Sequence, residues 1–144
     1  MSPRQVGLQW FIGWGLVFCL IGGCASSARL RVQADDHYRL AQSYLSNESY
    51  NLAEQEIRKA LGLQPEDVRY LECLALVHHA QVYQAQGALN ATRLQLAEEA
   101  YRVVLRQPEA PPSAAVNYSA ILLLNGRPDE AIAMAQRALP ASWL

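Results

Sequence analysis

The sequence has almost no excess of charge of either sign. Its 12 Lys and Arg stand against 13 Asp and Glu, which leaves a formal net charge of −1. A nucleic-acid-binding chain would show clustered Lys and Arg on a basic background, so we expect no nucleic-acid partner. The sequence also has no glycine-rich phosphate loop. With 51% apolar and 17% charged residues in 144 positions, it has the composition of one folded domain.

Cysteine is scarce, and the three cysteines are Cys19, Cys24 and Cys73. Two of them fall in an N-terminal processing segment, so the remaining one cannot build a disulfide framework. We expect Cys73 to be a small buried apolar residue, because free cysteine usually behaves in this way. The alternatives are an intermolecular disulfide bridge, or an enzyme or redox protein that works through Cys73 and the histidines.

Spacings typical of catalytic or metal sites are also missing. The adjacent His78 and His79 would point about 100° apart on a helix, so they cannot share a metal as an i, i+4 pair can. We expect one to be packed and the other exposed. The acidic pairs at 98–99 and 129–130 fall near predicted helix starts, where carboxylates interact favourably with the helix dipole. The sequence therefore predicts no enzyme, no metal site and no cofactor.

What the sequence does contain is a repeat, and residues 34–67 are its most regular copy. In this window of 34 residues, a set of mostly apolar and small residues stands at positions 4, 7, 8, 11, 20, 24, 27 and 32: His37, Leu40, Ala41, Tyr44, Ala53, Ile57, Ala60 and Pro65. These positions define a tetratricopeptide repeat, a pair of antiparallel helices, and the chain resembles that family.

The first copy predicts a helix over about 35–46 and a second one ending at about Leu63, before Pro65. Because the usual glycine is absent from the turn, we expect Asn47 to adopt the left-handed conformation. Asn51 followed by Glu54 predicts a capping box at the start of the second helix.

The second copy is less regular. Placing Gly87 at the end of its first helix assigns positions 4, 7, 8 and 11 to Leu76, His79, Ala80 and Tyr83, with residues 68–72 extending that helix backward. The next helical signature, Ala97 and Tyr101, then arrives five residues late. We therefore expect a lengthened second helix from about Asn90 through Gln107, and a hairpin that protrudes from the stack.

The third copy follows a connection containing Pro108, Pro111 and Pro112. Its repeat residues are Ala115, Tyr118, Ser119, Leu122, Ala131, Ala135 and Ala138, with Gly126 ending its first helix. No polar capping helix follows Pro140, although repeat stacks normally need one. The prediction is an all-α solenoid of about three helix-turn-helix units, at about 34–67, 68–108 and 112–144. Its uncapped end would allow a homodimer.

The N-terminus resembles a bacterial lipoprotein signal. After Arg4 comes an apolar run over Val6–Ile21, and Leu20-Ile21-Gly22-Gly23-Cys24 is similar to a lipobox. The resemblance implies acylation of the Cys24 thiol and cleavage before it, so that residues 1–23 are a signal peptide and 24–33 a lipidated tether. The alternative is an uncleaved membrane anchor, although the run of 16 residues is shorter than the roughly 20 that a spanning helix needs.

Ala25 after the acylated cysteine implies sorting to the outer membrane, with the repeats facing the periplasm. Lipobox, short tether and tandem repeats together resemble the type IV pilus biogenesis and stability lipoproteins of the PilF/PilW type, with residues 50–61 the most similar run. That resemblance implies a scaffold that binds protein partners and helps secretin subunits to assemble. Lipoproteins with the same repeats for tight-adherence pili or outer-membrane protein assembly remain alternatives.

In tetratricopeptide folds, the first helix of each repeat presents positions 2, 5, 9, 12 and 13 to a concave groove that binds peptides. The resemblance therefore implies a partner-binding groove formed by Tyr38, Gln42, Leu45, Val77, Gln81, Gln84, Val116, Ala120, Leu123 and Leu124. Such a groove is neutral with an apolar end, which suits an apolar or strand-like segment. It lacks the inward Lys, Arg and Asn that would clamp a carboxylate.

Overall fold

The computed structural model describes the backbone of residues 6–83 and 88–139, and the side chains of residues 26–83 and 88–139. Across these residues the chain forms six α-helices: α1 (Val6–Ser46), α2 (Tyr50–Leu63), α3 (Val68–Ala80), α4 (Ala91–Leu105), α5 (Pro112–Leu124) and α6 (Pro128–Arg137). The described β-structure is an isolated antiparallel bridge between Tyr83 and Leu89. The predicted all-α class is therefore confirmed for the described part of the chain.

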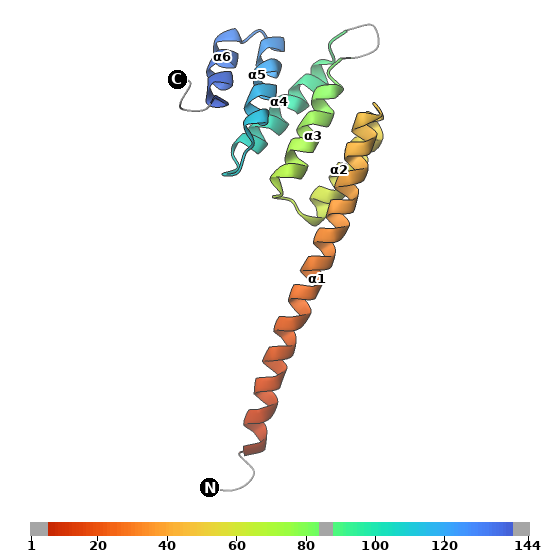
Figure 1. Ribbon diagram of the computed structural model, residues 1–144, viewed down its shortest axis with the longest axis vertical. Coiled ribbons are helices and arrows are strands. Elements are labelled where there is room, and N and C mark those ends of the chain that lie inside the picture. The colour runs from red at the N-terminus through yellow and green to blue at the C-terminus, as the bar shows by residue number, and fades with distance from the viewer. Residues whose placement is uncertain (1–5, 84–87, 140–144) are drawn as a thin grey trace.

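The helices pair in chain order into three hairpins, α1 with α2, α3 with α4, and α5 with α6 (Figure 1). The hairpins stack side by side, because α2 packs against α3 and α4 packs against α5. Each hairpin thus buries an apolar face that it could not bury alone. This arrangement agrees with the predicted solenoid of helix-turn-helix units.

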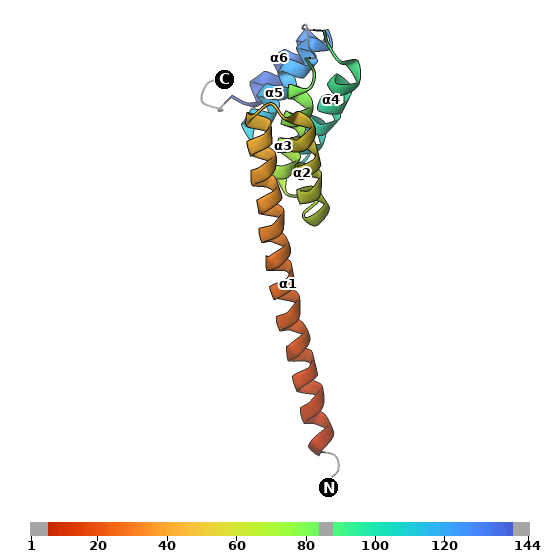
Figure 2. The ribbon, with the colours of Figure 1, turned by 90° about the vertical axis from the view of Figure 1, so that its right-hand side faces the viewer.

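Helix α1 is much longer than its partners, at 41 residues. Only its C-terminal part packs in the stack, and its N-terminal part projects well beyond the hairpins (Figures 1 and 2). The predicted tether, residues 24–33, is part of this helix. Among residues 26–83 and 88–139, no helix is long and apolar enough to cross a bilayer; the side chains of the apolar run Val6–Ile21 lie outside these residues.

The first turn differs from the prediction in two ways. The left-handed residue is Glu48, with φ 58°, and not Asn47. The predicted capping box is also wrong, because α2 begins at Tyr50 and Ser49 is its N-cap, without a side-chain cap hydrogen bond. Asn51 lies inside the first turn of α2, where its Oδ1 accepts a hydrogen bond from Gln81 Nε2 at 3.2 Å.

The second repeat corrects the predicted alignment. Helix α3 ends at Ala80, so Tyr83 lies outside it and the extra residues form the connection to α4. Residues 84–87, which include the Gly87 used to place this helix, are outside the described residues. The spacing of 34 residues from Ala41 to Ala75 gives the alignment that the structure follows. Helix α4 begins at Ala91, close to the predicted start at about Asn90. The side chain of Asn90 caps the helix by accepting a hydrogen bond from the Arg93 N–H.

The buried side chains form two clusters along the stack. The first joins α1, α2 and the start of α3: Ala34, Ala41, Ile57, Ala60, Tyr70 and Cys73. The second joins α3 to α6: Ala75, Val82, Leu94, Ala97, Tyr101, Val104, Ala114, Tyr118, Ile121, Leu122 and Ala131. Each cluster depends on contacts between neighbouring hairpins, as expected for a repeat stack.

Candidate interaction surface

The predicted groove residues of the first and third repeats lie on α1 and α5. On α1, Gln42 is exposed and its Nε2 donates to the Tyr38 hydroxyl at 2.9 Å, while Tyr38 and Leu45 are half-buried. On α5, Val116 is 52% and Leu123 is 58% exposed. These two large apolar side chains give the third repeat an apolar surface. Ala120 and Leu124 are half-buried beside them.

The predicted groove residues of the second repeat have to be corrected. Val77 is fully buried and therefore cannot contact a partner in this structure. Gln81 is the C-cap residue of α3 and binds Asn51 of α2, and Gln84 lies outside the described residues. The corrected alignment assigns the same repeat positions to Arg69, Glu72, Leu76, His79 and Ala80. The α3 part of the surface is thus more polar than expected.

Arg69 belongs to a polar cluster that joins α1 to the start of α3. Its Nη2 lies 3.1 Å from Asp35 Oδ1 and 2.7 Å from Asp67 Oδ2. Tyr70 donates its hydroxyl proton to Asp35 at 2.7 Å, and this hydrogen bond, with Arg69, holds the pKa of Asp35 below its usual value. Burial raises the pKa of Tyr70 to about 12. The cluster is internally paired, which indicates a role in joining the two repeats.

A second polar contact, missed by the sequence analysis, joins α2 to α4. Glu54 accepts from Arg58 Nη2 on its own helix and from Arg93 Nη1 of the next repeat, both at 2.8 Å. Burial raises the pKa of Glu54, but the hydrogen bonds from Arg58 and Arg93 outweigh this effect and lower it overall. Arg93 Nη1 also lies 3.4 Å from Nδ1 of the buried His78.

The same contact recurs one repeat later, between α4 and the start of α6. Glu98 accepts from Arg102 Nη2 at 2.5 Å and from Arg127 Nη1 at 2.6 Å. It also accepts from Asn125 Nδ2 at 2.6 Å and from the Tyr118 hydroxyl at 3.4 Å. The sequence of α2 has a glutamate directly after its buried alanine and an arginine four residues after the glutamate, and α4 has the same pattern. This shared Glu-x-x-x-Arg spacing is the sequence signal from which the paired glutamates could have been found.

The residues considered for chemistry are packed within the stack. Cys73 is 4% exposed, as predicted, and burial raises its thiol pKa to about 11, so the reactive thiolate is disfavoured. His78 is buried, whereas His79 is half-buried with Nδ1 3.1 Å from the Tyr101 hydroxyl, so the expectation of one exposed histidine is wrong. Within the described side chains, no group of three His, Cys, Asp or Glu residues is arranged to hold a metal ion.

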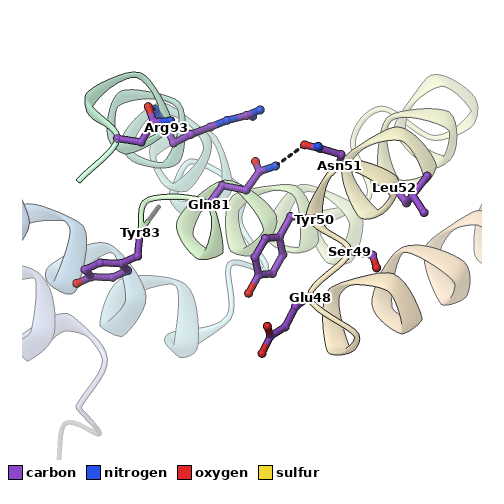
Figure 3. Close-up of a pocket in the computed structure, with 9 residues that line it drawn as sticks. Glu48, Ser49, Tyr50, Asn51, Leu52, Gln81, Tyr83 and Arg93 are labelled. Atoms are coloured by element: carbon purple, nitrogen blue, oxygen red, sulfur yellow. Dashed lines mark hydrogen bonds between the residues drawn. The ribbon is translucent and has the colours of Figure 1, made fainter. Parts of the chain in front are cut away.

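A surface pocket of about 370 Å³ opens where the first turn meets the connection between α3 and α4 (Figure 3). It is lined by Glu48, Ser49, Tyr50, Asn51, Leu52, Gln81, Tyr83, Asn90 and Arg93. Its lining is mostly polar, with two tyrosines. Helical spacing does not bring these residues together, so this pocket could not be predicted from the sequence pattern.

Comparison with known families gives two matches, both to tetratricopeptide repeats. One model matches residues 37–67, and the other matches residues 84–144. No curated protein matches the chain. The two matches cover α4 to α6 and most of the first hairpin, and the structure supplies the intervening α3 in the same stacking pattern. Tetratricopeptide repeats are scaffolds for interactions between proteins, and this chain is a protein that contains them.

Proposed function

We propose that the chain is a lipid-anchored scaffold on the periplasmic side of the outer membrane. The anchor is a set of acyl chains on Cys24, supported by the Leu20–Cys24 lipobox and by Ala25 after it. Gly22 and Gly23 support cleavage at this point, because glycine is disfavoured inside a helix by about 1 kcal/mol relative to alanine. The chain therefore opens most easily beside Cys24, where a peptidase needs an extended backbone.

The partner that we propose is a component of an envelope assembly, in particular a secretin subunit of a type IV pilus system. The observation that carries this proposal is the exposed apolar pair on α5, Val116 and Leu123. Exposed apolar side chains of this kind are suited to an apolar or strand-like segment of a protein that has not yet been assembled.

The anchor is tested by metabolic labelling with a fatty acid and by membrane fractionation of the Cys24→Ser variant. We expect the label and the membrane retention to be lost, whereas the control Cys19→Ser keeps both. Unchanged fractionation of Cys24→Ser would rule out the lipoprotein assignment.

The partner is tested by counting secretin multimers in outer membranes of cells that carry the Val116→Asp, Leu123→Asp double variant. We expect fewer multimers and no recovery of secretin with the tagged protein. Val32→Asp is the matched control, since Val32 is 62% exposed but lies on α1, outside the predicted groove and the pocket of Figure 3. Normal secretin assembly in the double variant would argue against this partner.

A homodimer is a second candidate, favoured by the exposed face of α6. Ile132 on α6 is 58% exposed and Leu139, which follows the helix, is 42% exposed, and no further described repeat covers them. Light scattering on the purified protein tests this: a dimer that dissociates in Ile132→Asp would support it. A monomer at high protein concentration would exclude it.

A further inference from the structure

The charges of the chain are divided unevenly between the tether, residues 24–33, and the repeats. Residues 34–144 carry nine Lys and Arg against all 13 Asp and Glu, a formal charge of −4. The tether carries two arginines, Arg29 and Arg31, and no acidic residue. It belongs to the part of α1 that leads away from the hairpins (Figures 1 and 2). Such an asymmetry within one chain indicates that the basic part meets a surface of opposite charge.

The two tether arginines have no counter-charge within the protein. Both are exposed and, among the described side chains, neither guanidinium has a hydrogen-bond or ion-pair partner. Arg39, the next arginine along α1, is paired with Asp36 at 3.2 Å. The arginines that join the repeats are each paired with a carboxylate: Arg69, Arg93 and Arg127. The free positive charge of α1 is therefore concentrated in the tether.

Arg31 has acidic neighbours, but they do not neutralise it. It lines a surface pocket together with Glu66 and Asp67 of the connection between α2 and α3. Asp67 is already paired with Arg69 at 2.7 Å, and no ion pair joins Arg31 to either carboxylate. The long arginine side chain can therefore extend along α1 toward the anchored end, as arginines near a membrane do.

The position of the arginines along α1 suits a membrane surface. At a rise of 1.5 Å per residue, they lie about 7.5 and 10.5 Å from Cys24. The Debye length at physiological ionic strength is about 8 Å, so both charges are within reach of a bilayer that holds Cys24. Asp35 and Asp36 follow about 16 to 18 Å from Cys24, at roughly two Debye lengths, where the surface potential is largely screened.

The directions of the two side chains favour a surface over a single bound anion. Residues two positions apart on a helix point about 200° apart, so Arg29 and Arg31 cannot grip one phosphate between them. They lie on opposite sides of a helix that leaves the anchor point. A layer of headgroups surrounding the helix can contact both, whereas a peptide segment along one side of it would contact only one.

We propose that Arg29 and Arg31 bind the phosphate groups of anionic phospholipids around the anchored Cys24. Each guanidinium donates its N–H groups to phosphate oxygens, for which its planar geometry is well suited. The same anionic surface repels the acidic repeats, so the contact is limited to the tether. This inference rests on the proposed lipid anchor, and it adds the class of lipid that surrounds it.

The test is energy transfer from the acylated protein to fluorescent lipids in vesicles. A donor dye on Gln33→Cys reports on the tether, because Cys73 is buried and Cys24 is acylated. The acceptors are phosphatidylglycerol and phosphatidylcholine that carry the same dye on an acyl chain and differ in the headgroup. We expect more transfer to phosphatidylglycerol, from a local enrichment of up to about fivefold per arginine, and a loss of this excess at high salt.

Two double variants decide whether the tether causes the enrichment. Arg29→Gln, Arg31→Gln should abolish the excess transfer. Arg106→Gln, Arg137→Gln is the matched control, because it removes the same charge from exposed positions on the repeats and should keep the excess. An excess that survives the tether variant, or that is lost equally in the control, would overturn the proposal.

The same measurement separates this inference from the anchor on which it rests. Equal transfer to the two lipids would overturn the headgroup contact while the anchor stands. No transfer to either lipid would mean that the tether is not at the membrane, and both the anchor and the headgroup contact would then be wrong.

Discussion

The two junctions between repeats share one polar contact but differ in what surrounds it. At the first junction, Glu54 of α2 meets Arg93, and the buried residues that follow Glu54 on α2 are Ile57 and Ala60. At the second, the equivalent Glu98 meets Arg127 beside Tyr101. The second junction therefore buries a large aromatic side chain at the position where the first buries isoleucine.

The carboxylates also differ in their number of donors. Glu98 accepts from Arg102, Arg127, Asn125 and Tyr118, whereas among the described side chains Glu54 accepts from Arg58 and Arg93 only. The first junction also carries the inserted connection between α3 and α4 and the pocket of Figure 3. The second junction therefore has more polar contacts between helices than the first.

Removing the buried Tyr101 ring from the second junction should cause the largest loss in the free energy of unfolding. Tyr101 is fully buried, and its truncation to alanine should cost about 3–5 kcal/mol, as for other buried aromatics. The equivalent Ile57→Ala should cost about 2–5 kcal/mol, and less than Tyr101→Ala in this chain. Chemical denaturation of both variants measures the difference, and a larger loss for Ile57→Ala would reverse the comparison.

A smaller effect is expected at the shared glutamates. Glu98→Ala leaves several donors without their acceptor, so we expect a loss of about 1–3 kcal/mol. Glu54→Ala should cost less, because the Glu54 carboxylate accepts from the side chains of Arg58 and Arg93, whereas that of Glu98 accepts from four side chains. Thermal melts at low and high salt should separate the two variants. Equal losses would mean that the additional donors of Glu98 contribute nothing.

Equivalent positions in the turns of the first and third repeats, Glu48 (φ 58°) and Gly126 (φ 70°), allow two substitutions whose effects on stability should be smaller and of opposite sign. Glu48→Gly should stabilise the protein by about 1 kcal/mol, and Gly126→Ala should destabilise it by a similar amount. A Cβ on Gly126 would meet nothing within 4 Å, so the backbone conformation alone is tested. Two shifts of the same sign in a urea titration would contradict this explanation.

The smallest effect should come from pH, because each junction contains one packed histidine. Burial lowers the pKa of His78, with Glu54 opposing this in part, and burial also lowers the pKa of His79. The unfolded chain therefore binds protons first as the pH falls below about 6.5, and the free energy of unfolding should decrease from there. His78→Gln and His79→Gln should each make the free energy of unfolding depend less on pH. Denaturation at pH 7.5 and 5.5 measures this dependence. An unchanged dependence in both variants would mean that neither histidine causes it.

The first repeat was predictable because each of its repeat positions is occupied by a residue of suitable size. Helix α1 ends at Ser46 and α2 ends at Leu63, as the spacing and Pro65 predicted. The alignment predicted for the second repeat is wrong because it uses Gly87 as the helix-ending glycine, whereas α3 ends at Ala80. The spacing of 34 residues between Ala41 and Ala75 predicts the alignment that the structure has. In a repeat stack the residues that pack between helices keep a constant spacing, while the connections vary in length.

The pocket was not predictable, for a physical reason. Glu48, Gln81 and Arg93 come from a turn, a helix end and a helix start, and only the packing of α2 against α3 brings them together. The groove prediction failed at Val77 for a simpler reason, because a shift in alignment moves a residue to another face of the helix.

The continuity of α1 also has a mechanical consequence. In the proposed cleaved chain, the part of α1 that precedes Ala34 is residues 24–33, which are about 15 Å long at a rise of 1.5 Å per residue. A helical tether of this length acts as a lever, so a tilt of about 10° at its anchored end would displace the stacked hairpins by about 3 Å. Whatever holds the N-terminal end of this lever therefore also sets the direction in which the repeats meet their partner.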